Sequence, residues 1–350
     1  MTSIRARAGI NPVRAGFSYS LLLRSAMILL LTVVAGCSSF KKNSTEGDLM
    51  LGVGVDGRLE SMTRPLIEDI FDDVVSTPQP ELQWVTQYVG EDSLGVISRW
   101  QNIILLGALE EDDPMSQRVQ RMLNDELRQG VLDGTLRVFR QKDVWVRGQT
   151  VVVAVAPTVD ELLAWLRVNG EVMDDLLSED RYARMKKSMY ARLEQEDLAD
   201  SLRKEHGWEI RIPNDYNITE SSRDADNYIR MRRMYPDRFV TIAWQPGPKD
   251  SISADKLIRW RDELGMTYTD SSRTNPIILD TTWTTLNGVD ALKANGIWET
   301  YGPIGGGPFV AYLLQKDGTL YLVDGKLFAP DRPKEAFVRH LDVFLNTFEP

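Results

Sequence analysis

The chain has 350 residues, a formal net charge of −10 at pH 7, 43% hydrophobic residues and nine tryptophans. This is the composition of a globular protein with ample core material, and the length suits one large domain or, more readily, two. The acidic balance disfavours binding to nucleic acid, whose phosphates require a basic surface.

The first 36 residues have the pattern of an export signal. Four arginines precede the apolar run from Met27 to Val34, no acidic residue occurs before Glu46, and small residues lead up to Cys37. The apolar run is about half the length of the roughly 20 residues that a membrane-spanning helix needs. The segment resembles a bacterial lipoprotein signal with its lipobox, which implies that Cys37 is acylated and becomes the first residue of the mature chain. The long basic region leaves open whether the start is Met1 or lies downstream.

The resemblance also implies a location. Ser38 follows the cysteine, where an aspartate would favour the inner membrane, so we expect a lipid-anchored protein of the cell envelope, at the outer membrane and facing the periplasm. Acyl chains such as palmitate hold a protein durably, because each buried methylene contributes about 0.8 kcal/mol. Loss of residues 1–36, with four arginines and no acid, lowers the net charge from −10 to −14. That charge disfavours contact of the folded body with anionic lipid, so the acyl chains provide the membrane contact.

Cys37 is the only cysteine in the chain. Its acylation leaves no thiol for a disulfide or a metal site. The polar residues 37–48 that follow predict a flexible tether between lipid and fold.

Residues 49–171 predict an N-terminal mixed α/β domain, in which strands and helices alternate. Pro65 suits the first turn of a helix, Asp113 suits an N-cap, and Thr158 with Glu161 forms a capping box. Helices are expected at residues 66–75, 114–127 and 159–166, and strands at residues 49–55, 83–89, 102–108, 136–139, 144–146 and 150–155.

Residues 172–206 are strongly charged and have helical periodicity. Tyr182, Met185, Met189 and Leu193 form an apolar stripe among lysines, arginines and glutamates. A partner-binding helix is one interpretation, but one packed face and one solvated face favour a helical connector.

Residues 207–350 predict a C-terminal α+β domain with an antiparallel sheet covered by helices, because consecutive strands are joined by short turns. Lys316-Asp317-Gly318 indicates a hairpin turn, and Asp331 suits the N-cap of the last helix. Helices are expected at residues 253–264 and 333–347, and strands at residues 208–212, 227–232, 239–244, 277–285, 289–299, 309–315 and 319–328. The fold class of the whole chain is therefore α+β.

Two resemblances follow from these segments. The order of strands and helices in the C-terminal part is similar to Mog1/PsbP-like domains. Over nearly the whole mature chain, several stretches resemble an uncharacterised family of bacterial lipoproteins known as a domain of unknown function, which implies an envelope location and no catalytic residues. These stretches are residues 102–105, 152–157, 208–214 (WEIRIPN), 305–311 (GGGPFVA) and 321–330 (YLVDGKLFAP).

Residues 52–57 fit the G-x-G-x-x-G fingerprint of dinucleotide-binding sites. That site needs a strand before the glycines and a helix that starts at them. The helix is expected only near Pro65 and the strand only at residues 49–51, so we expect no cofactor and interpret the motif as a strand followed by a turn.

Signals of catalysis are sparse. His206 and His340 are the only histidines, and they stand in no H-E-x-x-H motif; the chain has no G-x-S-x-G motif either. The acidic groups at residues 110–113 and 224–226 lack the spacing of a calcium loop. We therefore expect no metal site.

The glycine-rich segment 302–308 is the most unusual loop. Adjacent glycines indicate positive φ or a close backbone approach. It is either a connection between strands or a loop that lines a ligand, and the candidate ligand-lining residues are Gly305, Gly306, Gly307, Trp298, Tyr301 and Phe309.

These observations predict a lipid-anchored envelope protein that works by binding, scaffolding or assisting assembly, with an envelope protein or glycan as its partner. The alternative is an envelope hydrolase of glycan or peptide, with a histidine and carboxylates gathered only in the fold.

Overall fold

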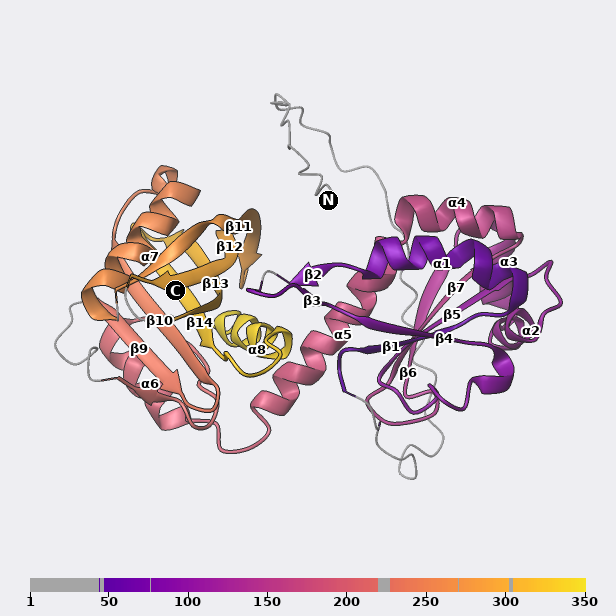
Figure 1. Ribbon diagram of the computed structural model, residues 1–350, viewed down its shortest axis with the longest axis horizontal. Coiled ribbons are helices and arrows are strands. Elements are labelled where there is room, and N and C mark those ends of the chain that lie inside the picture. The colour runs from indigo at the N-terminus through magenta and orange to yellow at the C-terminus, as the bar shows by residue number, and fades with distance from the viewer. Residues whose placement is uncertain (1–43, 45–46, 76, 220–226, 270, 302–304) are drawn as a thin grey trace. The chain divides into compact units, whose positions relative to one another are not determined.

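The structure is a computed structural model, and it describes residues 44, 47–75, 77–219, 227–269, 271–301 and 305–350 (Figure 1). The predicted signal, Cys37 and nearly all of the predicted tether lie outside these residues. In the part of the chain that is described, no helix combines the length and apolar character needed to cross a membrane. The α+β fold class is confirmed, because the described residues form eight α-helices and two main sheets, and the sheet of the C-terminal part is antiparallel.

The first sheet has five strands in the order β4-β1-β5-β7-β6, and all pair in parallel except β6. Every residue of β5 and β7 is buried, as expected for apolar strands covered on both faces. The strands are β1 (Met50–Gly54), β4 (Val85–Val89), β5 (Asn102–Ala108), β6 (Val138–Lys142) and β7 (Thr150–Ala156). A separate ribbon pairs β2 (Val74–Val75) with β3 (Glu81–Leu82).

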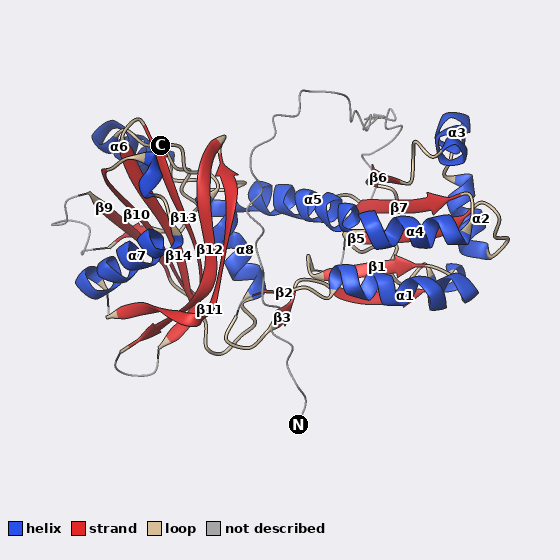
Figure 2. Ribbon diagram, turned by 90° about the horizontal axis from the view of Figure 1, so that it is seen from above, coloured by secondary structure: helices blue, strands red, loops and turns tan. Residues whose placement is uncertain are grey.

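Helices cover both faces of this sheet (Figure 2). One core contains apolar side chains of α1 (Gly57–Phe71) and α4 (Val159–Asn169). The opposite core contains those of α2 (Pro114–Arg121) and α3 (Asp125–Asp133). The arrangement is a three-layer α/β fold.

The structure corrects the expected start of the first helix. The helix α1 begins at Gly57 and not near Pro65, because its buried stripe already starts at Leu59 and Thr63. It ends at Phe71, so the last residues of the expected helix form β2 instead.

Two other expectations in this region are wrong. The helix expected over residues 114–127 is two helices, because Asn124 accepts a hydrogen bond from Leu127 N at 2.8 Å and caps α3. The strand expected at residues 144–146 is a loop between β6 and β7. The caps at Asp113 and Thr158 are confirmed, since they accept from Ser116 N at 2.9 Å and Glu161 N at 3.2 Å.

The second sheet has seven strands in the order β11-β12-β13-β14-β10-β9-β8, all antiparallel. The expected hairpin is confirmed: Lys316 pairs with Thr319, and Asp317 and Gly318 have φ values of 49° and 81°. The strands are β8 (Asn217–Ile218), β9 (Tyr228–Arg233), β10 (Asp237–Pro246), β11 (Ser272–Leu286), β12 (Val289–Thr300), β13 (Gly306–Lys316) and β14 (Thr319–Phe328).

Helices also cover this sheet on both faces. Apolar side chains of α7 (Ala254–Tyr268) pack in the core on one face. Those of α6 (Glu196–His206) and α8 (Glu335–Leu345) pack in the core on the other.

Residues 172–206, which were expected to be helical, form two helices, α5 (Glu171–Met189) and α6, with a break between them. Two expectations in this part are wrong. Residues 208–212 make only an isolated bridge, between Glu209 and Glu349. Asp331 does not cap the last helix, because the carboxylate of Glu81 accepts from the amides of Lys334 (2.6 Å) and Glu335 (2.8 Å).

Candidate functional site

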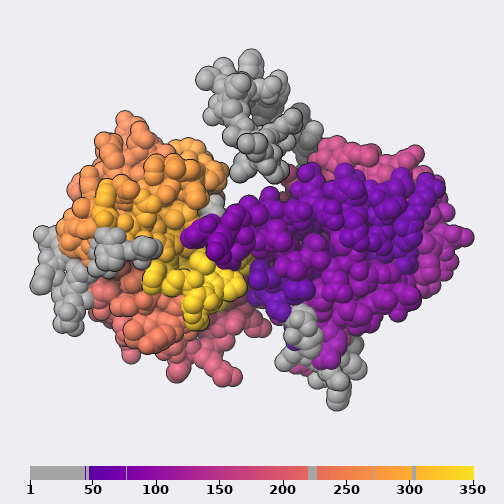
Figure 3. Space-filling model, in the orientation of Figure 1, coloured from indigo at the N-terminus to yellow at the C-terminus, as the bar shows by residue number. Residues whose placement is uncertain are grey.

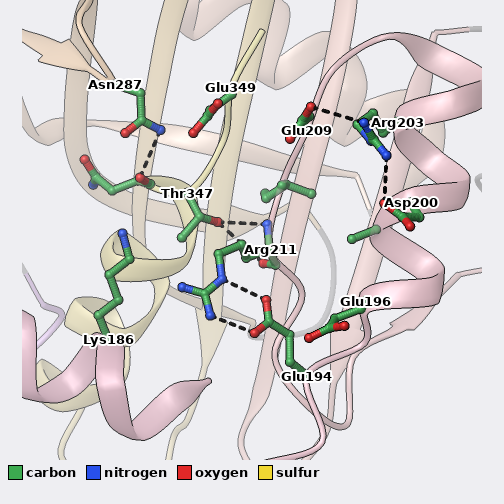
Figure 4. A pocket seen from close by; sticks show the side chains of 13 residues that line it. Lys186, Glu194, Glu196, Asp200, Arg203, Glu209, Arg211, Asn287, Thr347 and Glu349 are labelled. Atoms are coloured by element: carbon green, nitrogen blue, oxygen red, sulfur yellow. Dashed lines mark hydrogen bonds and ion pairs between the residues drawn. The ribbon is translucent and has the colours of Figure 1, made fainter. Parts of the chain in front are cut away.

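The candidate site is an open, charged pocket of about 430 Å³ on the C-terminal α+β part (Figure 4). One wall is a face of α6, where Glu196, Asp200 and Arg203 follow each other at helical spacing. The segment 209–211 and the chain around Thr347 complete it, with side chains from the β11–β12 turn and from α5.

Backbone and amide hydrogen bonds fix the walls of the pocket. Gln195 Nε2 donates to Pro213 O at 3.0 Å and to Tyr216 O at 2.7 Å, which holds the start of α6 against the following segment. Across the pocket, Arg211 N donates to Thr347 Oγ1 at 3.2 Å, and Asn287 Nδ2 donates to the Phe348 carbonyl at 2.8 Å. The site is therefore preformed by segments that are far apart in the sequence.

Arg211 is held in place inside the pocket. Its Nε and Nη2 donate to the two carboxylate oxygens of Glu194 at 2.8 and 2.7 Å, and its guanidinium lies 4.0 Å from the centre of the Tyr190 ring. The hydrogen bonds to Glu194 raise the pKa of Arg211 above its usual value. The pair is bidentate, so both charges have a fixed orientation.

The pocket has more acidic than basic groups. Glu196 and Glu349 are exposed and, among the described residues, have no hydrogen-bond or ion-pair partner for their carboxylates. Arg203 pairs with Asp200 at 3.0 Å and lies 3.8 Å from Glu209. The pocket is lined by five carboxylates and three cations: Glu194, Glu196, Asp200, Glu209 and Glu349, and Lys186, Arg203 and Arg211. This excess of negative charge favours a ligand with positive charge.

The pocket was not predicted from the sequence. The charged stripe of α6 was interpreted as part of a connector, and the neighbouring WEIRIPN stretch was expected to be a strand. The signal that was available is the recurrence of charged residues at positions 196, 200 and 203, one helical face with few apolar side chains.

The structure places the predicted glycine-rich loop at the β12–β13 hairpin. Gly306 and Gly307 belong to β13, Gly305 O accepts from Thr300 N at 3.0 Å, and residues 302–304 lie outside the described part. A Cβ atom at Gly307 would lie 2.0 Å from the carbonyl oxygen of Leu327, so this glycine permits a close approach of strands. A ligand at this loop stays a prediction.

The aromatic residues predicted to flank that loop separate in the fold. Trp298 and Phe309 are buried, and Trp298 Nε1 donates to Leu327 O at 3.1 Å. Tyr301 is 60% exposed, with the guanidinium of Arg273 4.3 Å from its ring centre.

The two histidines have different surroundings. His206 lies against the rings of Trp208 and Trp244, with centroids 5.6 and 4.9 Å away. His340 is partly buried on α8, and burial followed by nearby arginines lowers its pKa to about 4. Within the described residues, neither imidazole forms a hydrogen bond with a carboxylate or a hydroxyl, and Nε2 of His206 lies 3.9 Å from the carboxylate of Glu205. The hydrolase alternative stays a prediction.

In the G-x-G-x-x-G segment, Gly52 and Gly54 belong to β1, and α1 begins at the last glycine, Gly57, contrary to the expected start near Pro65. Side chains of the protein cover two of the glycines: a Cβ at Gly52 would lie 2.7 Å from Ile97, and one at Gly54 would lie 2.6 Å from Leu105. The carboxylate of Asp56 then accepts from Met115 N at 2.8 Å. Gly52 and Gly54 therefore make room for side chains of the protein itself. A dinucleotide site would instead need the backbone at these glycines to be open to the pyrophosphate. The described residues also contain no group of three or more potential metal ligands.

The comparisons with solved structures give matches of low sequence identity. No curated protein matches the chain at a significant level. Among solved structures, cyanobacterial PsbP (CyanoP) from Synechocystis sp. PCC 6803 is similar over 41% of this chain and 86% of that one, with 13% identity and a TM-score of 0.31. LpqN, involved in cell envelope biogenesis of Mycobacterium tuberculosis, is similar over 41% of this chain and 83% of that one, with 13% identity and a TM-score of 0.26.

A structure from Bacteroides thetaiotaomicron VPI-5482 is similar over 41% of this chain and 44% of that one, with 11% identity and a TM-score of 0.25. Similarities this low support no conclusion about activity or partner.

The family comparison covers the C-terminal part. The expected resemblance extended over nearly the whole mature chain, whereas the match begins at residue 195 and includes most of the pocket. Residues 195–347 match the profile of a family described as a domain of unknown function (DUF4837).

Proposed function

We propose that this protein is a lipid-anchored protein of the cell envelope that acts by binding, and that the pocket beside α6 receives a cationic segment of another envelope protein. The anchor is the acylated Cys37, at the outer membrane and facing the periplasm. The folded part carries the binding surface.

The observation that carries the binding proposal is the pair of exposed, unpartnered carboxylates of Glu196 and Glu349 beside the fixed Arg211–Glu194 pair. Lysine or arginine side chains of a partner would find two free carboxylates there. The pocket is open to solvent, which suits a peptide segment more than a small enclosed ligand.

The anchor is supported by the sequence pattern before Cys37, and mass spectrometry of the native protein tests it. The expected N-terminus is a diacylglyceryl-modified Cys37, and the Cys37→Ala variant is expected to leave the membrane fraction. An uncut, unmodified leader would contradict the proposal.

The pocket is tested with the Glu196→Lys/Glu349→Lys double variant. Exposed ion pairs contribute about 0.2–1 kcal/mol each, so two reversals are expected to weaken binding of a lysine- and arginine-rich peptide by about tenfold at low salt. Fluorescence anisotropy of the labelled peptide measures the affinity. The Asp197→Lys variant is the matched control, because Asp197 is exposed on α6 but does not line the pocket. Equal losses of peptide affinity in the double variant and in Asp197→Lys would show a general charge effect and refute a role of the pocket.

A further inference from the structure

Arg238, the second residue of β10, is buried and has no hydrogen-bond or ion-pair acceptor among the described residues. The residue is 5% exposed, and burial lowers the pKa of its guanidinium. Among the described residues no acceptor bonds this guanidinium, and its Nε atom is fully covered. A buried cation without a counter-charge is costly, because it loses hydration and gains no compensating contact.

Other buried arginines of the protein do have partners. Arg261, 4% exposed on the opposite face of the same sheet, donates to Asp324 at 2.7 Å and to Thr274 at 2.9 Å. Arg181 of α5 pairs with Glu335 at 2.8 Å. The lack of an acceptor at Arg238 is thus an exception, and it requires an explanation of its own.

A second unpartnered group lies beside Arg238. The Nδ1 atom of His340, on α8, is buried and has no hydrogen-bond partner. The ring of Phe337 neighbours both groups: its centre is 5.3 Å from Cζ of Arg238 and 6.3 Å from the centre of the His340 ring. Arg238 and His340, together with Arg233 of β9, are called the α8 cationic cluster below.

The acidic groups near the α8 cationic cluster do not balance its charge. Asp215 lies 3.7 Å from Arg233 and also attracts Arg238, but its side chain is 62% exposed, so solvent screens its charge. On α8 itself, Glu335 is held by Arg181 and by Arg339 at 2.9 Å. The charges of Arg238, Arg233 and Arg181 all act on His340 and oppose its protonation. The cluster therefore has an excess of positive charge.

The cluster is exposed in part: Nε of Arg238 and Nδ1 of His340 are covered, and Arg233 extends to the surface. His340 and Phe337 are half-buried, and the side chain of Arg233 is 34% exposed. The yellow C-terminal segment that contains α8 reaches the surface on the face drawn in Figure 3.

We propose that the α8 cationic cluster is a phosphate-binding site, in which Arg238 and Arg233 bind the oxygens of a phosphate group and His340 Nδ1 completes the contact. A guanidinium presents parallel N–H donors that match two phosphate oxygens, and a dianionic phosphate balances two arginines where a carboxylate balances one. The phosphate is either free, on a small ester, or in a lipid headgroup. The site is separate from the acidic pocket beside α6 and does not depend on its function.

The test is a titration of the full chain with inorganic phosphate, glycerol 3-phosphate, and vesicles with or without anionic phospholipid, at constant ionic strength set with sodium chloride. Acetate is titrated in the same way as a carboxylate control. The imidazole NMR signals report on the site, and a His206→Gln background leaves His340 as the only histidine. A bound phosphate is expected to shift the His340 signals and raise their titration midpoint by about one pH unit, because a nearby anion favours the protonated ring.

The Arg238→Met variant separates binding from folding. It is expected to lose at least tenfold in phosphate affinity, yet to have a higher Tm without ligand, because it removes an uncompensated buried charge. The Arg232→Met variant is the matched control: it removes an exposed arginine one residue away from Arg233, and its phosphate affinity should stay within twofold.

Each outcome of the titration either supports or overturns the phosphate site. Shifts with phosphate and its ester identify a soluble ligand, and shifts only with anionic vesicles identify a lipid headgroup; both support the site. Equal responses to phosphate and to acetate would overturn the choice of phosphate. No response of His340 to any phosphate, or equal losses in Arg238→Met and Arg232→Met, would overturn the site.

Discussion

The buried ammonium group of Lys326 gives a quantitative prediction for stability. Lys326 is 5% exposed on β14, its Nζ donates to Ser272 Oγ at 2.7 Å, and it lies 5.6 Å from the centre of the Trp298 ring. Burial, followed by the like charge of Arg261, lowers its pKa from 10.5 to about 7. We predict that this one group makes the stability of the protein depend on pH, and that Lys326→Met removes the dependence.

The sign follows from proton binding. Between pH 7 and 9 the unfolded chain keeps the Lys326 proton while the folded chain releases it, so the free energy of unfolding rises with pH. For a pKa that falls from 10.5 to about 7, the rise is about 2 kcal/mol over this window, and less than about 0.5 kcal/mol between pH 6 and 7. Below its folded pKa the group is protonated in both states, so the dependence disappears there.

Urea unfolding at pH 6, 7, 8 and 9 measures this effect as the difference between wild type and Lys326→Met. Taking the difference cancels the contributions of other titrating groups. The Lys316→Met variant is the matched control, because Lys316 is exposed in the β13–β14 hairpin. A wild-type-minus-variant difference that stays constant from pH 7 to 9 would refute the reasoning.

Two further variants test the packing around the same sheet. Gly307→Ala places a Cβ 2.0 Å from the carbonyl oxygen of Leu327 and should lower the free energy of unfolding by about 2 kcal/mol or more. The control Gly95→Ala, whose Cβ would have no atom within 4 Å, should change the free energy of unfolding by less than about 1 kcal/mol. Chemical denaturation compares the two variants, and equal effects would contradict the structure. Asp324→Asn leaves the guanidinium of Arg261 without its counter-charge and should cost about 3–5 kcal/mol in the same assay, and a cost below about 1 kcal/mol would show that the buried ion pair does not form.

Local signals in the sequence were reliable where the residues that satisfy the backbone are near each other in the chain. Asp113 and Thr158 bond amides three residues ahead, and Asp317-Gly318 adopts the positive φ values of its turn without help from distant residues. Such elements depend on short-range sterics and hydrogen bonds, which the sequence displays directly.

Elements completed by distant partners were mispredicted. The N-terminus of α8 is bonded by Glu81, more than 250 positions away, and not by the nearby Asp331. The segment expected as a strand at residues 208–212 finds only one bridge partner, Glu349 at the end of the chain. The apolar residues of this segment indicate only that it is partly buried. Whether it forms a strand depends on a neighbouring strand with which it can pair, and only the tertiary structure decides that.

The candidate site was beyond the sequence for the same reason. The pocket combines residues of α6, a turn at Asn287 and the chain end near Thr347, and none of these segments is unusual alone. The residues of the α8 cationic cluster also come from separate elements, β9, β10 and α8. The property that distinguishes the cluster is the lack of a hydrogen-bond acceptor at Arg238. A missing partner is visible only when every neighbour is known.

By itself the sequence determined the α+β class and the caps and turns formed by neighbouring residues, because these depend on periodicity and short-range geometry. It also contains the whole basis for the proposed lipid anchor, in the residues that lead up to Cys37. The tertiary structure alone decided the order of strands in each sheet, the start of α1, and which charges have partners. Charge pairing depends on distances of a few ångströms between residues that the chain separates by tens or hundreds of positions, so no local pattern specifies it.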